Sequence, residues 1–215
     1  MIKNPLFLPS MNTTNICIFG DSIAYGAWDA GGGWVDRLRG FLHNRTLASR
    51  FQDYFFVYHL GIPGDTTRDV LRRLKTEAMA REPHVIMFAV GINDARCQDS
   101  AGTPHVPYAM FTENMKKILT EAKRLAKTVV VVGLTQVDEA LTMPFEEDVF
   151  FEQKNIERYD AGLQKCAALA GVHYVPVWRA LDVKKDLEDG LHPNAAGHEK
   201  LFAAVQDFLS GRGIV

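Results

Sequence analysis

Residues 128–132 have the sequence Thr-Val-Val-Val-Val, in which every side chain is β-branched. β-Branched side chains favour strands, and a run that is apolar throughout is typical of a strand buried on both faces. Such a strand belongs in the middle of a parallel sheet that has helices on both sides. The run therefore predicts an α/β fold with a covered sheet.

The same alternation of strand and helix patterns continues on either side of this run. Short apolar runs that end near glycine, proline or polar residues predict four further strands, at residues 16–19, 55–60, 85–90 and 173–177. Apolar residues recur at helical spacing at about 34–42, 68–78, 111–125, 152–170 and 193–209. Successive βα units of this kind predict a single domain over residues 15–215, preceded by a tail at residues 1–14.

The composition places the chain among ordinary globular proteins. Its 215 residues are 47% apolar and 23% charged, and 24 Lys and Arg against 26 Asp and Glu leave a net charge of −2. A chain of this length buries a core without needing disulfides or a structural metal. The near-neutral charge argues against a nucleic-acid partner, and no apolar run approaches the roughly 18 residues of a membrane span. We therefore expect no nucleic-acid partner and no membrane span.

The three cysteines, Cys17, Cys97 and Cys166, form no CxxC pair and no Cys/His pattern. An odd number without such a pattern predicts neither a disulfide framework nor a zinc site, and it favours a reducing, cytoplasmic location. The first apolar run, Leu6-Phe7-Leu8, is too short for a secretory signal. Cys97 has no histidine at a spacing that would activate it, so we expect it to be a bystander.

Glycines and polar residues follow the predicted strands where the strands end. Because ligands of an open parallel sheet bind outside the carboxyl ends of its strands, we expect these residues to share one site. They form four blocks: Gly20-Asp21-Ser22, Gly61-Ile62-Pro63-Gly64-Asp65-Thr66, Gly91-Ile92-Asn93-Asp94 and Asp189-Gly190-Leu191-His192-Pro193. Together the blocks contain the reacting groups of a serine hydrolase.

The catalytic candidates come from the first and last blocks. Ser22 lies on a tight turn between a strand and a helix and is the candidate nucleophile. His192 is its candidate general base, and Asp189, three residues earlier, is placed to orient the imidazole. Pro193 at the first helical position would hold His192 at a helix cap. Each residue alone has an ordinary structural explanation as a cap or turn residue, and the combination carries the catalytic hypothesis.

The middle blocks supply the candidates for an oxyanion hole. The backbone N–H groups of Ser22 and Gly64 and the side-chain amide of Asn93 are the expected donors. Glycine at position 64 would let a backbone N–H come close to a reacting carbonyl.

In this order the four blocks resemble those of the SGNH, or GDSL-type, serine hydrolases, a family of esterases and lipases. The resemblance spans residues 16–210 and rests on residues 20–22, Gly64, residues 91–94 and residues 189–193. It implies a flavodoxin-like three-layer α/β/α sandwich with a five-stranded parallel sheet. Gly61 is the alternative for the family's glycine, and Gly64 is preferred because its Gly-Asp-Thr context matches better. Ile23 and Ile92 depart from the commonest family residues without touching a reacting group.

The expected activity is hydrolysis of a small-molecule carboxylic ester, with a short to medium acyl chain or an aryl group, through an acyl-enzyme and without a cofactor or metal. Carbohydrate or small-metabolite O-deacetylation and thioester hydrolysis are alternatives on the same site. A binding protein without turnover is the alternative from another class. A homodimer is the default expectation for assembly.

Substrate selection is expected to lie in the two long connections, residues 95–108 and 136–151, because both exceed what a plain connection needs. Their apolar content mildly favours an acyl or aryl group over a bare sugar; the residues concerned are Tyr108, Met143, Phe145, Phe150 and Phe151. We also place Asp21, Asp94, His105 and Tyr108 at the substrate, although the two aspartates are better explained as carboxylates that brace their loops.

Overall fold

Five parallel strands form one sheet in the order β2-β1-β3-β4-β5. The structure is a computed structural model and describes residues 12–215. The strands are β1 (Asn12–Gly20), β2 (Asp53–Gly61), β3 (Val85–Ala89), β4 (Thr128–Val132) and β5 (His173–Val175). This strand order is that of the flavodoxin-like fold, which confirms the architecture implied by the resemblance.

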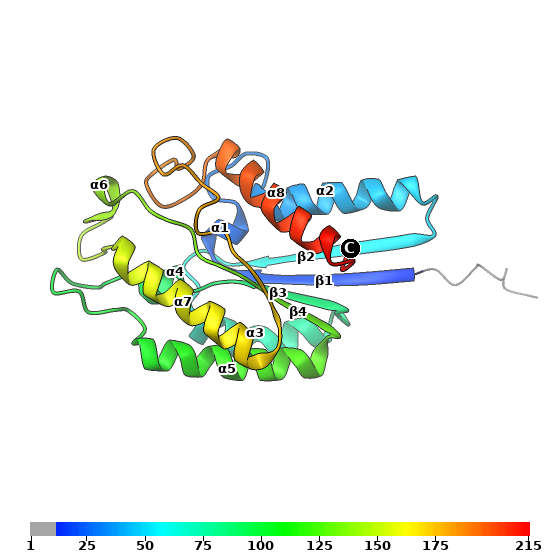
Figure 1. The fold of residues 1–215 in the computed structure, drawn as a ribbon, viewed down its shortest axis with the longest axis horizontal. Helices are drawn as coiled ribbons and strands as arrows, with labels where there is room; N and C mark the ends of the chain where they lie inside the picture. The colour runs from blue at the N-terminus through cyan, green and yellow to red at the C-terminus, as the bar shows by residue number, and fades with distance from the viewer. Residues whose placement is uncertain (1–11) are drawn as a thin grey trace, which may run out of the picture.

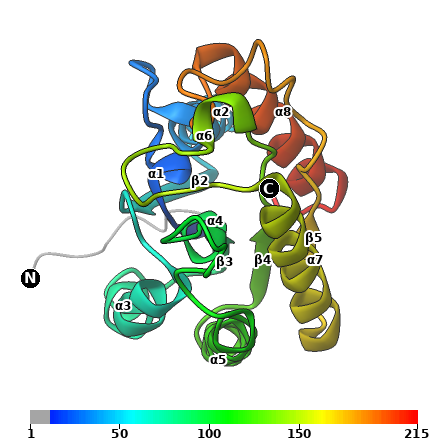
Figure 2. The same ribbon diagram turned by 90° about the vertical axis from the view of Figure 1, so that its left-hand side faces the viewer.

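Helices cover both faces of the sheet (Figures 1 and 2). On one face lie α2 (Gly33–Ala48) and α8 (Ala195–Gly211), and on the other lie α3 (Thr67–Met79), α5 (Tyr108–Leu125) and α7 (Gln153–Ala170). Three short helices stand at the carboxyl edge of the sheet: α1 (Ser22–Tyr25), α4 (Ile92–Ala95) and α6 (Glu139–Thr142). None of the helices in residues 12–215 is long and apolar enough to cross a membrane.

Alternation along the strands divides the core between the two helical layers. In β4, Val129 and Val131 pack with the layer of α3, α5 and α7, whereas Val130 and Val132 pack with the layer of α2 and α8. All four valines are buried. The valine run therefore stabilises both layers at once, at about 1.5–3 kcal/mol for each fully buried side chain.

Two of the boundaries that differ from the expectation change a predicted assignment. β1 begins at Asn12, so residues 12–14 of the expected tail belong to the sheet, and the remainder of that tail lies outside the described residues. The last helix begins at Ala195, and the predicted start at Pro193 is wrong. Asn194 is the N-cap, because its side-chain oxygen accepts from the N–H groups of Ala196 (3.0 Å) and Gly197 (3.1 Å).

Because all five strands are parallel, their carboxyl ends face the same way. Three of the sequence blocks follow β1, β2 and β3, and the fourth precedes α8. All four meet at this edge of the sheet, which faces the viewer in Figure 2.

Candidate active site

A chain of hydrogen bonds links Ser22, His192 and Asp189. The Ser22 Oγ lies 2.9 Å from His192 Nε2, and His192 Nδ1 lies 2.7 Å from Asp189 Oδ2. An ionised carboxylate only accepts hydrogen bonds, so Nδ1 carries the proton and Nε2 is free to accept from the serine hydroxyl. This is the tautomer that a general base needs.

The turn between β1 and α1 presents Ser22. Asp21 is the N-cap of α1, and its side chain accepts from the N–H of Ile23 at 3.0 Å. Ser22 is the first residue of the helix, so its own N–H has no partner within the helix. Gly20 permits the close approach of β3, since a Cβ there would lie 2.6 Å from the carbonyl oxygen of Ala89.

The loop before α8 holds the carboxylate and the imidazole together. Asp189 Oδ1 accepts from the backbone N–H groups of Leu191 (3.0 Å) and His192 (2.8 Å). Burial alone would raise the pKa of Asp189, but its hydrogen bonds with the His192 side chain and backbone outweigh burial and hold that pKa well below its usual range. Asp189 is therefore ionised at every pH at which the imidazole can act as a base.

The sequence predicted that a helix cap holds His192, but in the structure it is held differently. The carbonyl of His192 accepts from the N–H of Glu188 at 2.8 Å, and Pro193 bridges to Leu187. These two contacts close the loop on itself, and this closure replaces the predicted role of Pro193.

The residues expected to form an oxyanion hole stand beside Ser22. Residues 62–65 form a turn in which the N–H of Asp65 donates to the carbonyl of Ile62 (3.1 Å), with Pro63 second and Gly64 third at φ +85°. These are the residues that a type II turn prefers. The turn leaves the Gly64 N–H unused. Gly61 instead ends β2 against α1, where a Cβ would lie 2.6 Å from the backbone N of Tyr25.

Asn93 approaches from α4. Its side-chain amide donates to the carbonyl of Asp65 at 3.1 Å, and the residue is buried. That bond uses one of the two amide hydrogens, so the other stays free for a ligand.

A pocket of about 260 Å³ opens above these groups. Ser22, Gly64, Asn93 and His192 lie in its wall, and the other lining residues are Tyr25, Ala27, Trp28, Pro63, Arg96, Phe145, Glu146, Val149, Phe151 and Leu191. The two long connections therefore do contribute to the pocket. Met143 and Phe150 line a separate hollow with Cys97.

The described lining of this pocket includes none of the four residues expected at the substrate, and each has a different environment. Asp21 caps α1. Asp94, which is fully buried, accepts from the N–H (2.9 Å) and the hydroxyl of Thr67. Tyr108 packs edge-on against Tyr159 with ring centroids 5.3 Å apart, and the His105 N–H donates to the Arg96 carbonyl at 2.7 Å. The two aspartates thus brace their loops.

Burial dominates the titration of both bracing carboxyls. It raises the pKa of Asp21 to about 7 and that of Asp94 to about 7, against the lowering effect of the hydrogen bonds that each accepts. The negative charge of Asp94 adds a smaller increase to the pKa of Asp21.

Residues 18–200 match the GDSL-like lipase/acylhydrolase family. The chain belongs to this family. It is therefore a GDSL-type ester hydrolase, as the sequence blocks implied.

Relatives of this GDSL-type hydrolase agree with that assignment. It is 27% identical over 210 residues to the GDSL esterase/lipase At5g62930 of Arabidopsis thaliana, across 88% of this chain and 83% of the relative. It is 26% identical over 195 residues to the GDSL esterase/lipase CPRD49 of the same plant, across 85% of this chain and 73% of the relative.

Solved structures share the fold. LAE5, an α/β hydrolase enzyme from the metagenome of Lake Arreo, superposes with a TM-score of 0.73 at 19% identity, across 94% of this chain and 96% of that one. Axe2, an acetylxylan esterase from Geobacillus stearothermophilus, superposes with a TM-score of 0.73 at 21% identity, across 93% and 94%.

Three residues in the pocket of the GDSL-type hydrolase lie outside every predicted block and connection: Tyr25, Ala27 and Trp28. Arg96 and Leu191 lie within predicted segments but were not singled out. Each lies within six residues of a block that was recognised, so closeness to those blocks was the available signal. Periodicity could not single them out, because they lie on irregular loops and short helices. Within residues 12–215, no three His, Cys, Asp or Glu side chains gather as a metal site.

Proposed function

We propose that this GDSL-type hydrolase cleaves carboxylic esters through an acyl-enzyme on Ser22. The observation that carries the proposal is the 2.9 Å contact between Ser22 Oγ and His192 Nε2, which lies within proton-transfer distance. As Oγ attacks the carbonyl carbon, its proton passes to Nε2. Asp189 stabilises the imidazolium that forms, because its carboxylate lies 2.7 Å from Nδ1.

The carbonyl oxygen becomes negatively charged during this attack. The N–H groups of Ser22 and Gly64 and the free amide hydrogen of Asn93 are the donors that we assign to it. When the tetrahedral intermediate collapses, the leaving alcohol takes the proton from Nε2 and the acyl group stays on Oγ. Water then attacks the acyl-enzyme with His192 again as the base, and the acid is released.

Solved variants of Axe2 provide indirect support. Those described as catalytic mutants of that enzyme replace a serine, an aspartate and a histidine. These are the residue types that we propose as catalytic in this chain.

The pocket wall supports an apolar acyl or aryl group. Phe145, Phe151 and Leu191 form an apolar side of the pocket next to His192. The ring of Phe145 lies 6.2 Å from the imidazole ring. A pocket of about 260 Å³ suits a short to medium acyl chain or an aryl ester.

O-Deacetylation of a carbohydrate is the second candidate. Its support is the exposed aromatic rim, where Tyr25 and Trp28 are 54% and 68% exposed, together with the fold shared with an acetylxylan esterase. Esters with acyl chains of two to twelve carbons, assayed beside acetylated sugars, separate the two candidates. A preference for acetylated sugars would reject the proposal that the substrate carries an apolar acyl or aryl group.

Fluorophosphonate labelling tests the serine mechanism, because the probe requires an activated serine. The wild-type chain should gain one adduct on Ser22 and lose activity. Ser22→Ala should gain none, with kcat/KM for a chromogenic ester lower by roughly 10³-fold or more. The exposed Ser100 provides the control, since Ser100→Ala should behave as wild type. Unchanged turnover in a folded Ser22→Ala variant would reject the mechanism. The cytoplasmic location and the homodimer stay predictions.

A further inference from the structure

Trp28 donates a hydrogen bond to the carboxylate of the catalytic candidates. Its indole Nε1–H lies 3.0 Å from Asp189 Oδ2, the same oxygen that lies 2.7 Å from His192 Nδ1. The other oxygen, Oδ1, accepts from two backbone N–H groups. With Trp28 in place, both oxygens of Asp189 accept two hydrogen bonds each, and these four bonds together define the orientation of the carboxylate.

The indole also borders the imidazole. The rings of Trp28 and His192 meet edge to face with centroids 5.9 Å apart. Trp28 is nevertheless 68% exposed, more than any other aromatic side chain in residues 12–215. Its link to the site therefore lies in its two specific contacts, the hydrogen bond to Asp189 and the edge-to-face contact with His192.

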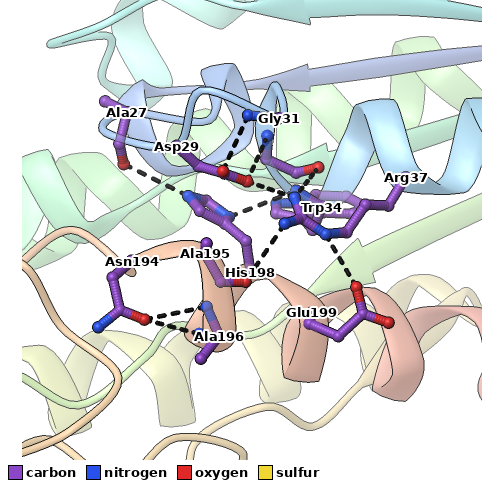
Figure 3. Close-up of polar contacts among 12 residues, drawn as sticks. Ala27, Asp29, Gly31, Trp34, Arg37, Asn194, Ala195, Ala196, His198 and Glu199 are labelled. Atoms are coloured by element: carbon purple, nitrogen blue, oxygen red, sulfur yellow. Dashed lines mark hydrogen bonds and ion pairs between the residues drawn. The ribbon is translucent and has the colours of Figure 1, made fainter.

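Buried polar contacts hold the loop that carries Trp28 (Figure 3). His198, fully buried on α8, accepts from the Trp34 N–H at Nδ1 (3.3 Å), and its Nε2 lies 3.3 Å from the Ala27 carbonyl. One imidazole therefore ties both sides of the loop to the helix that follows His192.

Charged groups hold the middle of the same loop. Asp29 accepts from the Gly31 N–H (2.9 Å) and pairs with Arg37, which also reaches Glu199 on α8 at 2.9 Å (Figure 3). At the end of the loop a Cβ on Gly33 would lie 2.4 Å from the Cα of Gly26, so only glycine lets the loop close. Contacts with α8 and within the loop thus fix the backbone that carries Trp28.

We propose that Trp28 is a positioning residue for the catalytic pair, holding Asp189 in the plane that the His192 imidazole requires and keeping water from their hydrogen bond. This inference rests on the proposed function. The N–H of Trp28 keeps Oδ2 directed at Nδ1, and the ring covers one edge of the imidazole. Loss of the N–H leaves Oδ2 open to water, which competes with Nδ1 for the carboxylate.

Trp28→Phe removes the N–H and keeps an aromatic ring. We expect kcat to fall about tenfold, the effect of one hydrogen bond to a charged acceptor, while KM changes less than about twofold. Trp178→Phe is the matched control, because Trp178 lies outside the pocket and donates no hydrogen bond within residues 12–215. It should leave both constants unchanged. A Trp28→Phe variant that alters KM alone would make Trp28 a substrate contact and overturn the proposal.

A double-mutant cycle tests whether Trp28 acts through Asp189. In an Asp189→Asn background, Trp28→Phe should change kcat less than about twofold, because the carboxylate that it orients is absent. An equal tenfold loss in both backgrounds would contradict the proposal.

One readout does not depend on turnover. The downfield proton resonance of His192 Nδ1–H should broaden in Trp28→Phe as exchange with water speeds up, and it should stay sharp in Trp178→Phe. A resonance unchanged by Trp28→Phe would reject the positioning role. If Ser22→Ala instead retains full activity, the serine mechanism fails, and this spectrum still reports on Trp28.

Discussion

The side-chain amide of Asn93 donates to the backbone carbonyl of Asp65 at 3.1 Å. This bond joins α4 to the turn that carries Gly64, so two proposed oxyanion donors from different strand ends are held in one arrangement. Donors fixed in place before the reaction need no reorganisation when charge develops, which is the condition for strong electrostatic stabilisation.

Asn93→Ala should therefore lower kcat by roughly 10²-fold with little change in KM, because the oxyanion forms only after the substrate is bound. Steady-state kinetics on a chromogenic ester measure both constants. A rise in KM at constant kcat would instead make Asn93 a ground-state contact.

Gly91→Ala should both destabilise the fold and slow the reaction. Gly91 has φ +137°, and a Cβ there would lie 3.2 Å from Phe111 Cε2. The strain should cost about 1–3 kcal/mol and displace Asn93, two residues further on. Gly102→Ala is the control, since Gly102 also has a positive φ, +82°, but no atom within 4 Å of an added Cβ. Thermal unfolding and kcat should separate the two variants, and equal effects would refute the steric argument.

Asp94 should make stability depend on pH. Burial raises its pKa in the folded chain to about 7, above about 3.9 for an unfolded aspartate, so the folded chain binds this proton more tightly. Its contribution to stability is full below pH of about 4 and is lost as the pH rises to about 7.

In Asp94→Asn this loss is absent, so the free energy of unfolding should fall less between pH of about 4.5 and 7.5 than in wild type. The falls in unfolding free energy of wild type and Asp94→Asn should differ by no more than roughly 1.4 kcal/mol per pH unit. Asp21 titrates the same way and remains in the variant. Urea unfolding at both pH values measures the effect, and Asp207→Asn, at an exposed position, provides the control. Parallel pH profiles for Asp94→Asn and wild type would contradict the burial argument.

Arg96 should favour esters that carry a negative charge. Its side chain lines the pocket and forms no ion pair within residues 12–215, and its Nε has no hydrogen-bond partner. Glu146, the other charged lining residue, is exposed. A guanidinium in a pocket binds carboxylates well.

Arg96→Gln should raise KM about tenfold for a monosuccinate ester and less than about twofold for the butyrate ester of the same alcohol. The two substrates share a four-carbon acyl chain and differ in charge. Equal changes for both would show that Arg96 shapes the pocket without selecting charge.

Much of the fold and part of the candidate site could be predicted from local patterns. The valine run at residues 128–132 required a sheet covered on both faces, and β4 has those bounds. Residues at strand ends could be assigned to one edge, since parallel strands bring their carboxyl ends together. The blocks around Ser22, Asn93 and His192 carried enough residue identity to indicate the family.

Other features depend on contacts between distant segments. Trp28 meets Asp189 across 161 positions, and Ser22 meets His192 across 170. No spacing along the chain encodes the first of these pairs, because it arises only when the Gly26–Gly33 loop packs on α8. The substrate predictions for His105 and Tyr108 remained unsupported for the same reason, since the path of a long loop is set by what it packs against.

Apolar periodicity and the residues at strand ends were thus enough to predict the strands, the helices and the candidate catalytic groups. Tertiary packing alone decided which side chains surround those groups, because the contacts that place Trp28 and Arg96 at the pocket come from segments that meet only in the folded chain.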